Sequence, residues 1–437
     1  MGLTTLLITG IFFFLFLGTF WRPIFGIQFY LCVYILFNPY SWWATIFKMV
    51  PRPSLFAAMV AIGGTLIHAK KAQWSISRRE IELYLFLGAV WLSSMVFGVG
   101  LHENSWIYLD KVTKIFLFLF FFLRVVHSLE TYKYVMWTII LTGLFFTYQA
   151  HIAGSGVYYD GRLDSLGGAD FSEGNSFASF IVSGITFLGF QMLRFAWWKK
   201  FLCIIALAPM LNTVIMVQSR GVFLGMLIAA LFILLRPLKA YRKQLFLYLI
   251  LGLVAFSLLA STQFLDRMKT ISGYIKSDQS GVTAAEDGAL GRFDFWKASV
   301  AIFKDHPFGI GVKNFEEIVS QYDPRNPGLD AHNTYVLCYT EIGILGFVLY
   351  MIIIFEALAQ IRRIRKLTKG TISDSEISIL ALSLSTVLLI YITGTMPTHS
   401  LLYSEFTWIL LSMPICLENA AKKLLEDENN STSERVA

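Results

Sequence analysis

Three side chains suited to proton and phosphate chemistry stand at expected helix starts: Arg220, Arg292 and His332. His332 has Asp330 and Asn333 as neighbours, whose polar groups can orient an imidazole, and an apolar segment starts directly after it. Because its ordinary pKa is about 6.5, an imidazole here can act as a general base near neutral pH. The alternative interpretation is a polar histidine at a helix end, without a chemical role.

The two arginines are suited to binding an anion. Arg292 lies at the predicted start of a helix, because residues 291–303 place apolar side chains at helical spacing. Free backbone N–H groups at a helix start and a guanidinium attract the same anion. Arg220 lies in Gln218-Ser219-Arg220-Gly221, between two apolar segments. The alternatives are a solvated or salt-bridged Arg292 and an Arg220 that only anchors a helix end at an interface.

The remaining polar segments give weaker candidates. The glycine-rich residues 151–173 are expected to form a mobile flap. Arg162 in this flap is a weak candidate for binding the substrate, and so are Asp330 and Asn333 beside His332. No metal site is predicted, because the sequence has no HExxH, no Cys/His cluster and no Asp-x-Asp. No cofactor is predicted either, and Gly309-Ile310-Gly311 is expected to be a tight turn.

The elements that must position these residues are transmembrane helices. The chain of 437 residues is 56% hydrophobic and only 15% charged, which excludes an ordinary water-soluble domain. A helix needs about 20 apolar residues to cross a bilayer. We therefore predict an all-α polytopic membrane protein. Its apolar segments are near 3–20, 24–37, 53–69, 81–100, 112–126, 133–150, 174–193, 201–217, 221–235, 244–261, 333–359, 376–395 and 403–417.

The number of spans is predicted as 12 or 13, because only Trp21-Arg22-Pro23 separates the first two segments. These two are read as two spans, a broken helix or a re-entrant pair. Lys and Arg accumulate in cytoplasmic loops. Four short basic loops carry this signal, and they place five segments on the outer face: 38–52, 101–111, 151–173, 262–332 and 396–402. The net charge of +7 is explained by this topology and does not indicate nucleic-acid binding.

Four regions follow from this organisation. Residues 1–261 form a transmembrane helical region, 262–332 one large and partly helical outer loop, and 333–417 the C-terminal transmembrane helices. Residues 418–437 form a cytoplasmic tail, whose polar part from Glu426 to Ser433 is expected to be disordered. The candidate base and both arginines then lie on one outer face. We expect them to surround one outward-facing cavity lined by the long loop.

From about Ser219 to Gly346 the chain resembles the O-antigen ligase superfamily, which includes O-antigen ligases, O-antigen polymerases and bacterial protein O-glycosyltransferases. The matching motifs come in the family's order. They are Ser219-Arg220-Gly221, Gly291-Arg292 followed by Trp296, His306-Pro307-Phe308-Gly309-Ile310-Gly311 with Asn314-Phe315, and Ala331-His332-Asn333-Thr334-Tyr335 followed by Glu341-Ile342-Gly343-Ile344-Leu345-Gly346.

The resemblance implies a metal-independent glycosyltransferase of the Gram-negative inner membrane, with its site and the loop 262–332 on the periplasmic face. The implied donor is a glycan on undecaprenyl diphosphate, and the implied acceptor is a hydroxyl group. His332 matches the family's catalytic histidine, and Arg220 and Arg292 match its essential arginines. We expect an O-antigen ligase of lipopolysaccharide biosynthesis, with lipid A-core as the acceptor. Its other expected partners are the membrane lipids that surround it.

The acceptor stays open at this point. An O-antigen polymerase or a protein O-glycosyltransferase uses the same donor, and Trp21-Arg22-Pro23 with Asn38-Pro39 is similar to the opening of ligases linked to protein O-glycosylation. A polysaccharide transporter is an alternative of another class. It should carry paired charges deep within helices or broken-helix repeats, whereas these apolar segments are nearly free of charge away from their ends. A membrane scaffold would not need His332 and the two arginines on one face.

Overall fold

Apolar helices make up most of the structure, a computed structural model. It describes residues 2–38, 41, 43–44, 50–152, 156–159, 161–168, 170–236, 238–276, 296–324, 328, 330–371 and 373–436. Arg292 and its neighbours in the predicted helix start lie outside the described residues. The N-terminal helices are α1 (Leu3–Gly18), α2 (Pro23–Leu36), α3 (Pro53–Ile67), α4 (Arg78–Leu92) with a π-helical turn η3 (Ser93–Phe97), α5 (Glu103–Val125) and α6 (Leu129–His151).

The second half continues this pattern after a short β-hairpin. The hairpin pairs β1 (Val157–Tyr159) antiparallel with β2 (Arg162–Ser165). The helices that follow are α7 (Gly174–Gln191), α8 (Trp197–Val217), α9 (Arg220–Leu235), α10 (Arg242–Leu259), α11 (Thr262–Lys276), α13 (Phe315–Tyr322), α14 (Thr334–Leu337) with the π-helical turn η6 (Cys338–Ile342), α15 (Gly343–Leu367), α16 (Asp374–Ile390) with the π-helical turn η7 (Tyr391–Thr395), and α17 (Glu405–Val436). Residues 296–305 are also helical.

Local sequence explains where many of these helices begin. Proline occupies the first turn of α2 and α3, where its missing N–H group leaves no helical hydrogen bond unmade. Ser77 and Ser128 cap α4 and α6 with their hydroxyls, in reciprocal capping boxes. The helix bounds fall within a few residues of most of the predicted apolar segments, although α5 begins earlier than predicted.

The described helices support a multi-pass membrane protein. Six are long and apolar enough to cross a bilayer. They are Arg78–Phe97, Gly174–Arg194, Trp197–Val217, Lys239–Leu259, Thr334–Leu367 and Asp374–Thr395. Four shorter apolar helices accompany them: Leu3–Gly18, Pro23–Leu36, Pro53–Ile67 and Arg220–Leu235. The all-α membrane class is thus confirmed. The total of 12 or 13 crossings stays a prediction.

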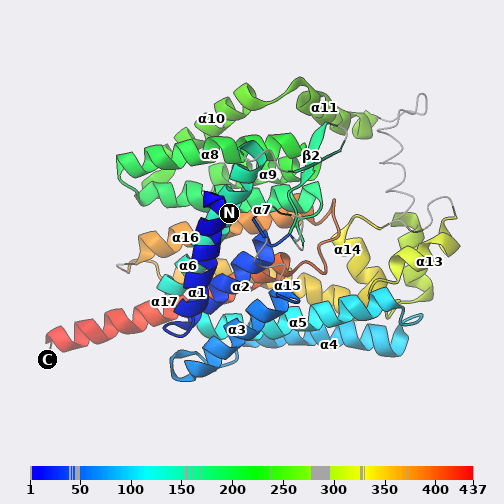
Figure 1. Cartoon of the computed structure of the whole chain (residues 1–437), viewed down its shortest axis with the longest axis horizontal. Coiled ribbons are helices and arrows are strands. Elements are labelled where there is room, and N and C mark those ends of the chain that lie inside the picture. The colour runs from blue at the N-terminus through cyan, green and yellow to red at the C-terminus, as the bar shows by residue number, and fades with distance from the viewer. Residues whose placement is uncertain are drawn as a thin grey trace.

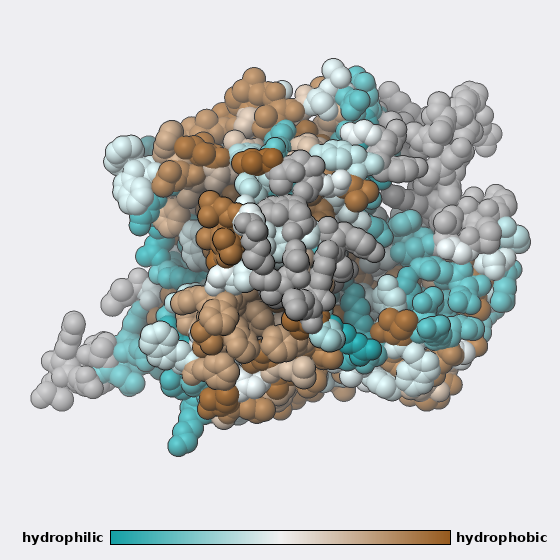
Figure 2. Space-filling view, in the orientation of Figure 1, coloured by the Kyte–Doolittle hydropathy of each residue, from teal (hydrophilic) through white to brown (hydrophobic). Residues whose placement is uncertain are grey.

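The helices form one elongated bundle (Figure 1). Most of them run along the long axis of the view, with α8, α9 and α10 on one side and α3, α4 and α5 on the other. The α13 helix lies at one end, and the C-terminal part of α17 projects at the opposite end. Figure 2 shows apolar surface over the helical sides, and polar surface gathered around the end that carries α13.

The segment 262–332 is partly helical, as predicted, and residues 309–311 fix it to the bundle. The Ile310 N–H donates to Thr340 O (3.0 Å) and the Gly311 N–H donates to Glu341 O (2.9 Å). Gly309 has a φ of +97°, and a Cβ atom there would clash with Glu341 O and lie 2.8 Å from Gly343 N. The turn lies just before the predicted place, at residues 307–308, where the Gly309 N–H donates to His306 O (3.0 Å). Residues 309–311 instead run alongside η6, and the glycines permit this close approach.

The tail differs from its prediction. Helix α17 continues as far as Val436, through the polar stretch Glu426–Ser433. The prediction of disorder was wrong because α17 begins with a buried apolar half, which supplies the nucleus from which a polar helix can continue.

Candidate functional site

A cavity of about 370 Å³ lies where the starts of α7 and α9 meet the loops before α14 and α17. Its lining contains three arginines, two carboxylates and a histidine. The lining residues are Arg162, Asp164, Glu173, Gly174, Asn175, Gln218, Ser219, Arg220, Gly221, Arg267, His332 and Thr398. Two of the residues singled out from sequence for catalysis, Arg220 and His332, thus share one cavity, together with the weaker candidate Arg162.

The Ser219-Arg220-Gly221 motif places Arg220 through its two neighbours. Ser219 caps α9 by accepting the N–H of Val222 (3.3 Å), and its hydroxyl donates to Asn175 Oδ1 at the start of α7 (2.7 Å). Gly221 lies so close to η7 that a Cβ atom would clash with Thr398 Oγ1 and approach Gly394 O to 2.6 Å. The motif therefore holds the first turn of α9 against α7 on one side and η7 on the other.

His332 is held in an unusual backbone conformation. Its φ of +46° is in the left-handed region, which costs a non-glycine residue about 1–2 kcal/mol. Thr334 keeps the segment in place: its N–H donates to Met396 O (2.8 Å), its hydroxyl donates to His399 O (2.7 Å), and the same hydroxyl accepts the Leu401 N–H (2.9 Å). The strain at His332 is thus maintained by hydrogen bonds to the segment that carries His399.

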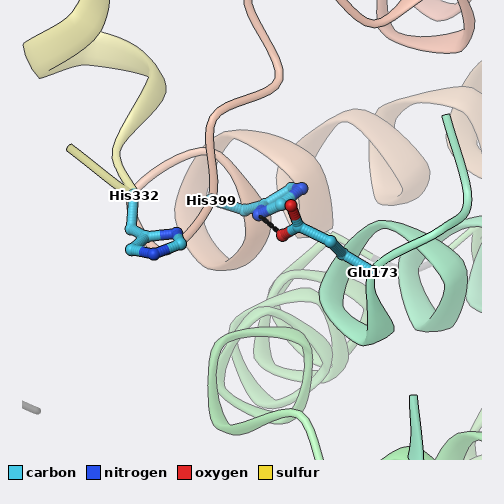
Figure 3. A group of neighbouring side chains, drawn as sticks. All are labelled: Glu173, His332 and His399. Atoms are coloured by element: carbon cyan, nitrogen blue, oxygen red, sulfur yellow. Dashed lines mark ion pairs between the residues drawn. The ribbon is translucent and has the colours of Figure 1, made fainter. Parts of the chain in front are cut away.

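A second histidine and a carboxylate stand beside His332 (Figure 3). His399 Nδ1 lies 3.0 Å from Glu173 Oε2, and the His399 side chain is only 8% exposed. One ligand-type atom from each of Glu173, His332 and His399 lies within 4.8 Å of the other two. Burial raises the pKa of the Glu173 carboxyl, His332 opposes this effect, and Asp330 and Asp164 reinforce it.

The arginines of the cavity come from three separate elements. Arg162 is on β2, where it lies 3.6 Å from Asp164 Oδ1. Arg220 begins α9, and Arg267 projects from α11. All three are partly exposed, so their guanidiniums can reach a ligand in the cavity. Permanently charged, planar guanidiniums around one cavity favour a di-anionic group such as a diphosphate.

Asp330 and Asn333 flank His332 but are not among the lining residues. Asp330 accepts a hydrogen bond from Ser400 Oγ (2.9 Å). Asn333 caps α14, with its Oδ1 accepting the N–H groups of Tyr335 (2.9 Å) and Val336 (3.2 Å). In the structure both side chains thus support the backbone around His332. Arg292 lies outside the described residues, so its role stays a prediction.

Sequence reasoning missed three residues of this site: Glu173, Arg267 and His399. Glu173 and His399 lie in the outer segments 151–173 and 396–402, for which no proton or metal chemistry was predicted. One signal was present, because all three fall in segments predicted to be on the outer face with His332. Their spacing in the chain has no motif, so their meeting is a product of the tertiary fold.

The arrangement combines a possible proton acceptor with a set of anion ligands. His332 lines a cavity together with Arg162, Arg220 and Arg267. Such a cavity can bind a phosphate-containing leaving group and place a hydroxyl group next to an imidazole. The sequence has no metal-binding motif, so no metal site was predicted. The fold nevertheless brings together Glu173, His332 and His399, three residues of types that can bind a metal ion, from distant segments of the chain.

Residues 205–351 match the family model described as O-antigen ligase. No curated protein matches the chain. The matched region contains Arg220, Arg267 and His332, and it covers the motifs from Ser219 to Gly346 on which the resemblance was based. The match confirms that resemblance, and supports a glycosyltransferase-like enzyme that acts on a lipid-linked polysaccharide in a membrane.

Proposed function

Because residues 205–351 carry the domain of the O-antigen ligase superfamily, we propose that this protein is an O-antigen ligase. It moves a glycan from undecaprenyl diphosphate to a hydroxyl group of lipid A-core, in the biosynthesis of lipopolysaccharide. The observation that carries the proposal is the shared cavity of His332 and Arg220, two residues from separate parts of the matched domain.

His332 acts as the general base in this proposal. Its imidazole takes the proton of the acceptor hydroxyl while the hydroxyl oxygen attacks the anomeric carbon of the donor sugar. The bond between that carbon and the diphosphate oxygen breaks, and its electron pair leaves with undecaprenyl diphosphate. Attack from the face opposite the diphosphate inverts the configuration at the anomeric carbon. A positioned base contributes about a hundred-fold to ten-thousand-fold to such a reaction.

The arginines stabilise the leaving group. Negative charge grows on the diphosphate as the sugar–oxygen bond breaks, and guanidiniums fixed before the reaction stabilise this charge without reorganisation. Arg220 is the central residue in this role, Arg162 and Arg267 extend it, and Arg292 is expected to join them. With this charge compensation the reaction needs neither a metal ion nor a cofactor.

The cavity accounts for only part of the substrates. Its volume of about 370 Å³ is near the lower end of the range for small-molecule sites. It suits the diphosphate and the sugar attached to it, so the lipid tails and the rest of the glycan lie outside. The lining comes from the predicted outer segments 151–173, 262–332 and 396–402, and from the adjoining helix starts. This favours a site on the periplasmic face of the inner membrane.

A reconstituted transfer assay tests the proposal. Purified full-length protein receives glycan-linked undecaprenyl diphosphate and one of three acceptors: lipid A-core, a second carrier-linked glycan, or a pilin-like protein. A chelator is present throughout. We expect product on lipid A-core, and a loss of about a hundred-fold or more in His332→Ala. His127→Ala is the matched control, because its ring contacts Lys71 O away from the cavity.

The other outcomes are informative in different ways. Product on the second glycan would make the protein a polymerase, and product on the pilin-like protein would make it a protein O-glycosyltransferase. A His332→Ala variant that transfers at the wild-type rate would reject the assigned base. No transfer by folded wild-type protein to any acceptor would favour the transporter alternative.

A further inference from the structure

Glu173, His332 and His399 form a side-chain cluster whose composition goes beyond what the transfer reaction uses. Glu173 precedes α7, His332 precedes α14, and His399 lies between η7 and α17. Figure 3 shows His399 and Glu173 in contact, with His332 to one side of them. Their ligand-type atoms lie within 4.8 Å of one another. The reaction proposed above assigns a task to His332 only.

The cluster has the chemistry of a transition-metal site. Two imidazoles and a carboxylate are the ligand set that binds Zn²⁺ in many proteins, with water or a substrate group in the fourth position. Tetrahedral ligands at the usual bond lengths of about 2.0–2.1 Å are about 3.3 Å apart. The His399–Glu173 distance of 3.0 Å is already close to this value. The Glu173 side chain is 56% exposed, so it can rotate to complete the site.

The two histidines are held together by the same hydrogen bonds. The Thr334 hydroxyl donates to His399 O (2.7 Å), and the Thr334 N–H donates to Met396 O (2.8 Å). These bonds fix the backbone two residues after His332 to the backbone of His399. Ligands fixed by the fold lose little conformational freedom when they bind an ion.

We propose that Glu173, His332 and His399 bind Zn²⁺ or a similar transition-metal ion, and that the bound ion inhibits glycan transfer. The inhibition rests on the proposed function, because the ion takes the lone pair with which His332 would accept the acceptor's proton. Metal bound at this place therefore blocks the reaction instead of assisting it. A site with hard oxygen ligands would select Mg²⁺ or Ca²⁺, whereas imidazoles select the zinc class.

Opposing charges set the strength of this site. Arg162, Arg220 and Arg267 line the same cavity and weaken the binding of a cation. The carboxylate of Asp164 lines the same cavity, and its negative charge favours a cation. We therefore expect binding that a chelator can reverse. The negative charge of the diphosphate donor compensates the positive charge of the arginines. Bound donor should therefore not act as a simple competitor of the metal ion.

The first experiment measures metal binding without transfer. Purified full-length protein is titrated with Co²⁺, whose visible absorption reports low-coordinate imidazole ligation, and with Zn²⁺ against a fluorescent chelator. We expect one equivalent bound by the wild type, and at least ten-fold weaker binding in His332→Ala, His399→Ala and Glu173→Gln. His102→Ala is the matched control, because His102 Nε2 and Glu317 Oε2 form another His–carboxylate pair at 3.8 Å.

Thermal unfolding keeps the test sharp if His399→Ala folds poorly. Zn²⁺ should raise the Tm of the wild type and of His102→Ala, since an ion that binds only the folded state stabilises it. The Tm of Glu173→Gln, whose altered side chain is half exposed, should respond much less. Equal Zn²⁺ affinity in wild type and all three cluster variants, or no binding at all, would overturn the proposal.

The second experiment adds Zn²⁺ and then a chelator to the transfer assay. We expect Zn²⁺ to lower the rate and the chelator to restore it. Metal binding at the cluster with a rate indifferent to Zn²⁺ would overturn the inhibition. A chelator that abolishes transfer would also overturn the inhibition, together with the metal-independent mechanism. If no transfer is found at all, the binding experiment still decides whether the cluster is a metal site.

Discussion

Arg124 and Arg220 both stand at the end of an apolar helix, but they meet opposite surroundings. Arg124 ends α5, where its side chain is 1% exposed and donates to Glu80 Oε2 (2.5 Å) and to Ser75 O (3.0 Å). Arg220 begins α9 beside a cavity that also contains Arg162 and Arg267. One arginine is paired with a buried carboxylate, while the other lines a cavity together with two further arginines and two partly exposed carboxylates.

The difference separates structural from functional charge in a membrane protein. A buried guanidinium with a buried carboxylate links α4 to α5, and removal of either partner leaves an uncompensated charge. Guanidiniums that share a cavity repel one another and are stabilised by an anionic ligand. Loss of a partner should therefore damage folding at the first place and substrate handling at the second.

The largest effect on stability is expected at Arg124. Arg124→Ala leaves the Glu80 carboxylate buried without its partner, which should lower the free energy of unfolding by about 3–5 kcal/mol. Denaturant or thermal unfolding in detergent measures this loss. Arg78→Ala is the control, because Arg78 is 94% exposed and lies 3.9 Å from its carboxylate partner Glu82. Equal stability of the two variants would refute the structural role of Arg124.

Arg220→Ala should have the reverse profile. We expect transfer to fall by about a hundred-fold to a thousand-fold, the usual effect of removing one preorganised charge-stabilising group. The Tm should change little, since Arg220 is partly exposed and borders a cavity. Arg220→Lys should recover only part of the rate, because an ammonium does not make the bidentate contact. A large fall in Tm would show that Arg220, like Arg124, mainly stabilises the fold.

Gly221→Ala should disturb both properties to a moderate degree. The added methyl group would clash with Thr398 Oγ1 and displace the first turn of α9, at a cost of about 1–3 kcal/mol in stability. Because Arg220 moves with this turn, transfer should fall as well. Gly252→Ala on α10 is the control, since a Cβ atom there meets nothing within 4 Å. Wild-type behaviour of Gly221→Ala would show that the close crossing is not needed.

The smallest effect is expected at Arg267. Arg267→Gln should reduce transfer by about ten-fold, mainly through a higher KM for the donor, because this residue adds one phosphate contact to those of Arg220. Lys269→Gln on the same helix is the control, since Lys269 is 76% exposed. Equal kinetics of both variants would place Arg267 outside the donor site.

The sequence predicted the helices well, because long apolar segments with capping residues are local signals. His332 and Arg220 were expected to share a cavity, since each lies in a short motif at a helix start, and both line the cavity described above. The meeting of His399 and Glu173 was not predictable, because their ion pair joins segments separated by the helices from α7 to α16 and depends on how α7 packs against η7. The left-handed conformation of His332 was hidden for the same reason: it is imposed by the hydrogen bonds of Thr334 with residues 396–401.

The modest size of the cavity has a consequence for specificity. A volume of about 370 Å³ surrounds a linkage and the groups next to it, and the remainder of a long polymer stays in solution. Such a site has no means of measuring the length of the glycan, because chains of few or many repeats place the same atoms in the cavity. Under the proposed function, product lengths would therefore copy the lengths of the donors supplied, and the length distribution would be inherited from the reactions that build the carrier-linked glycan.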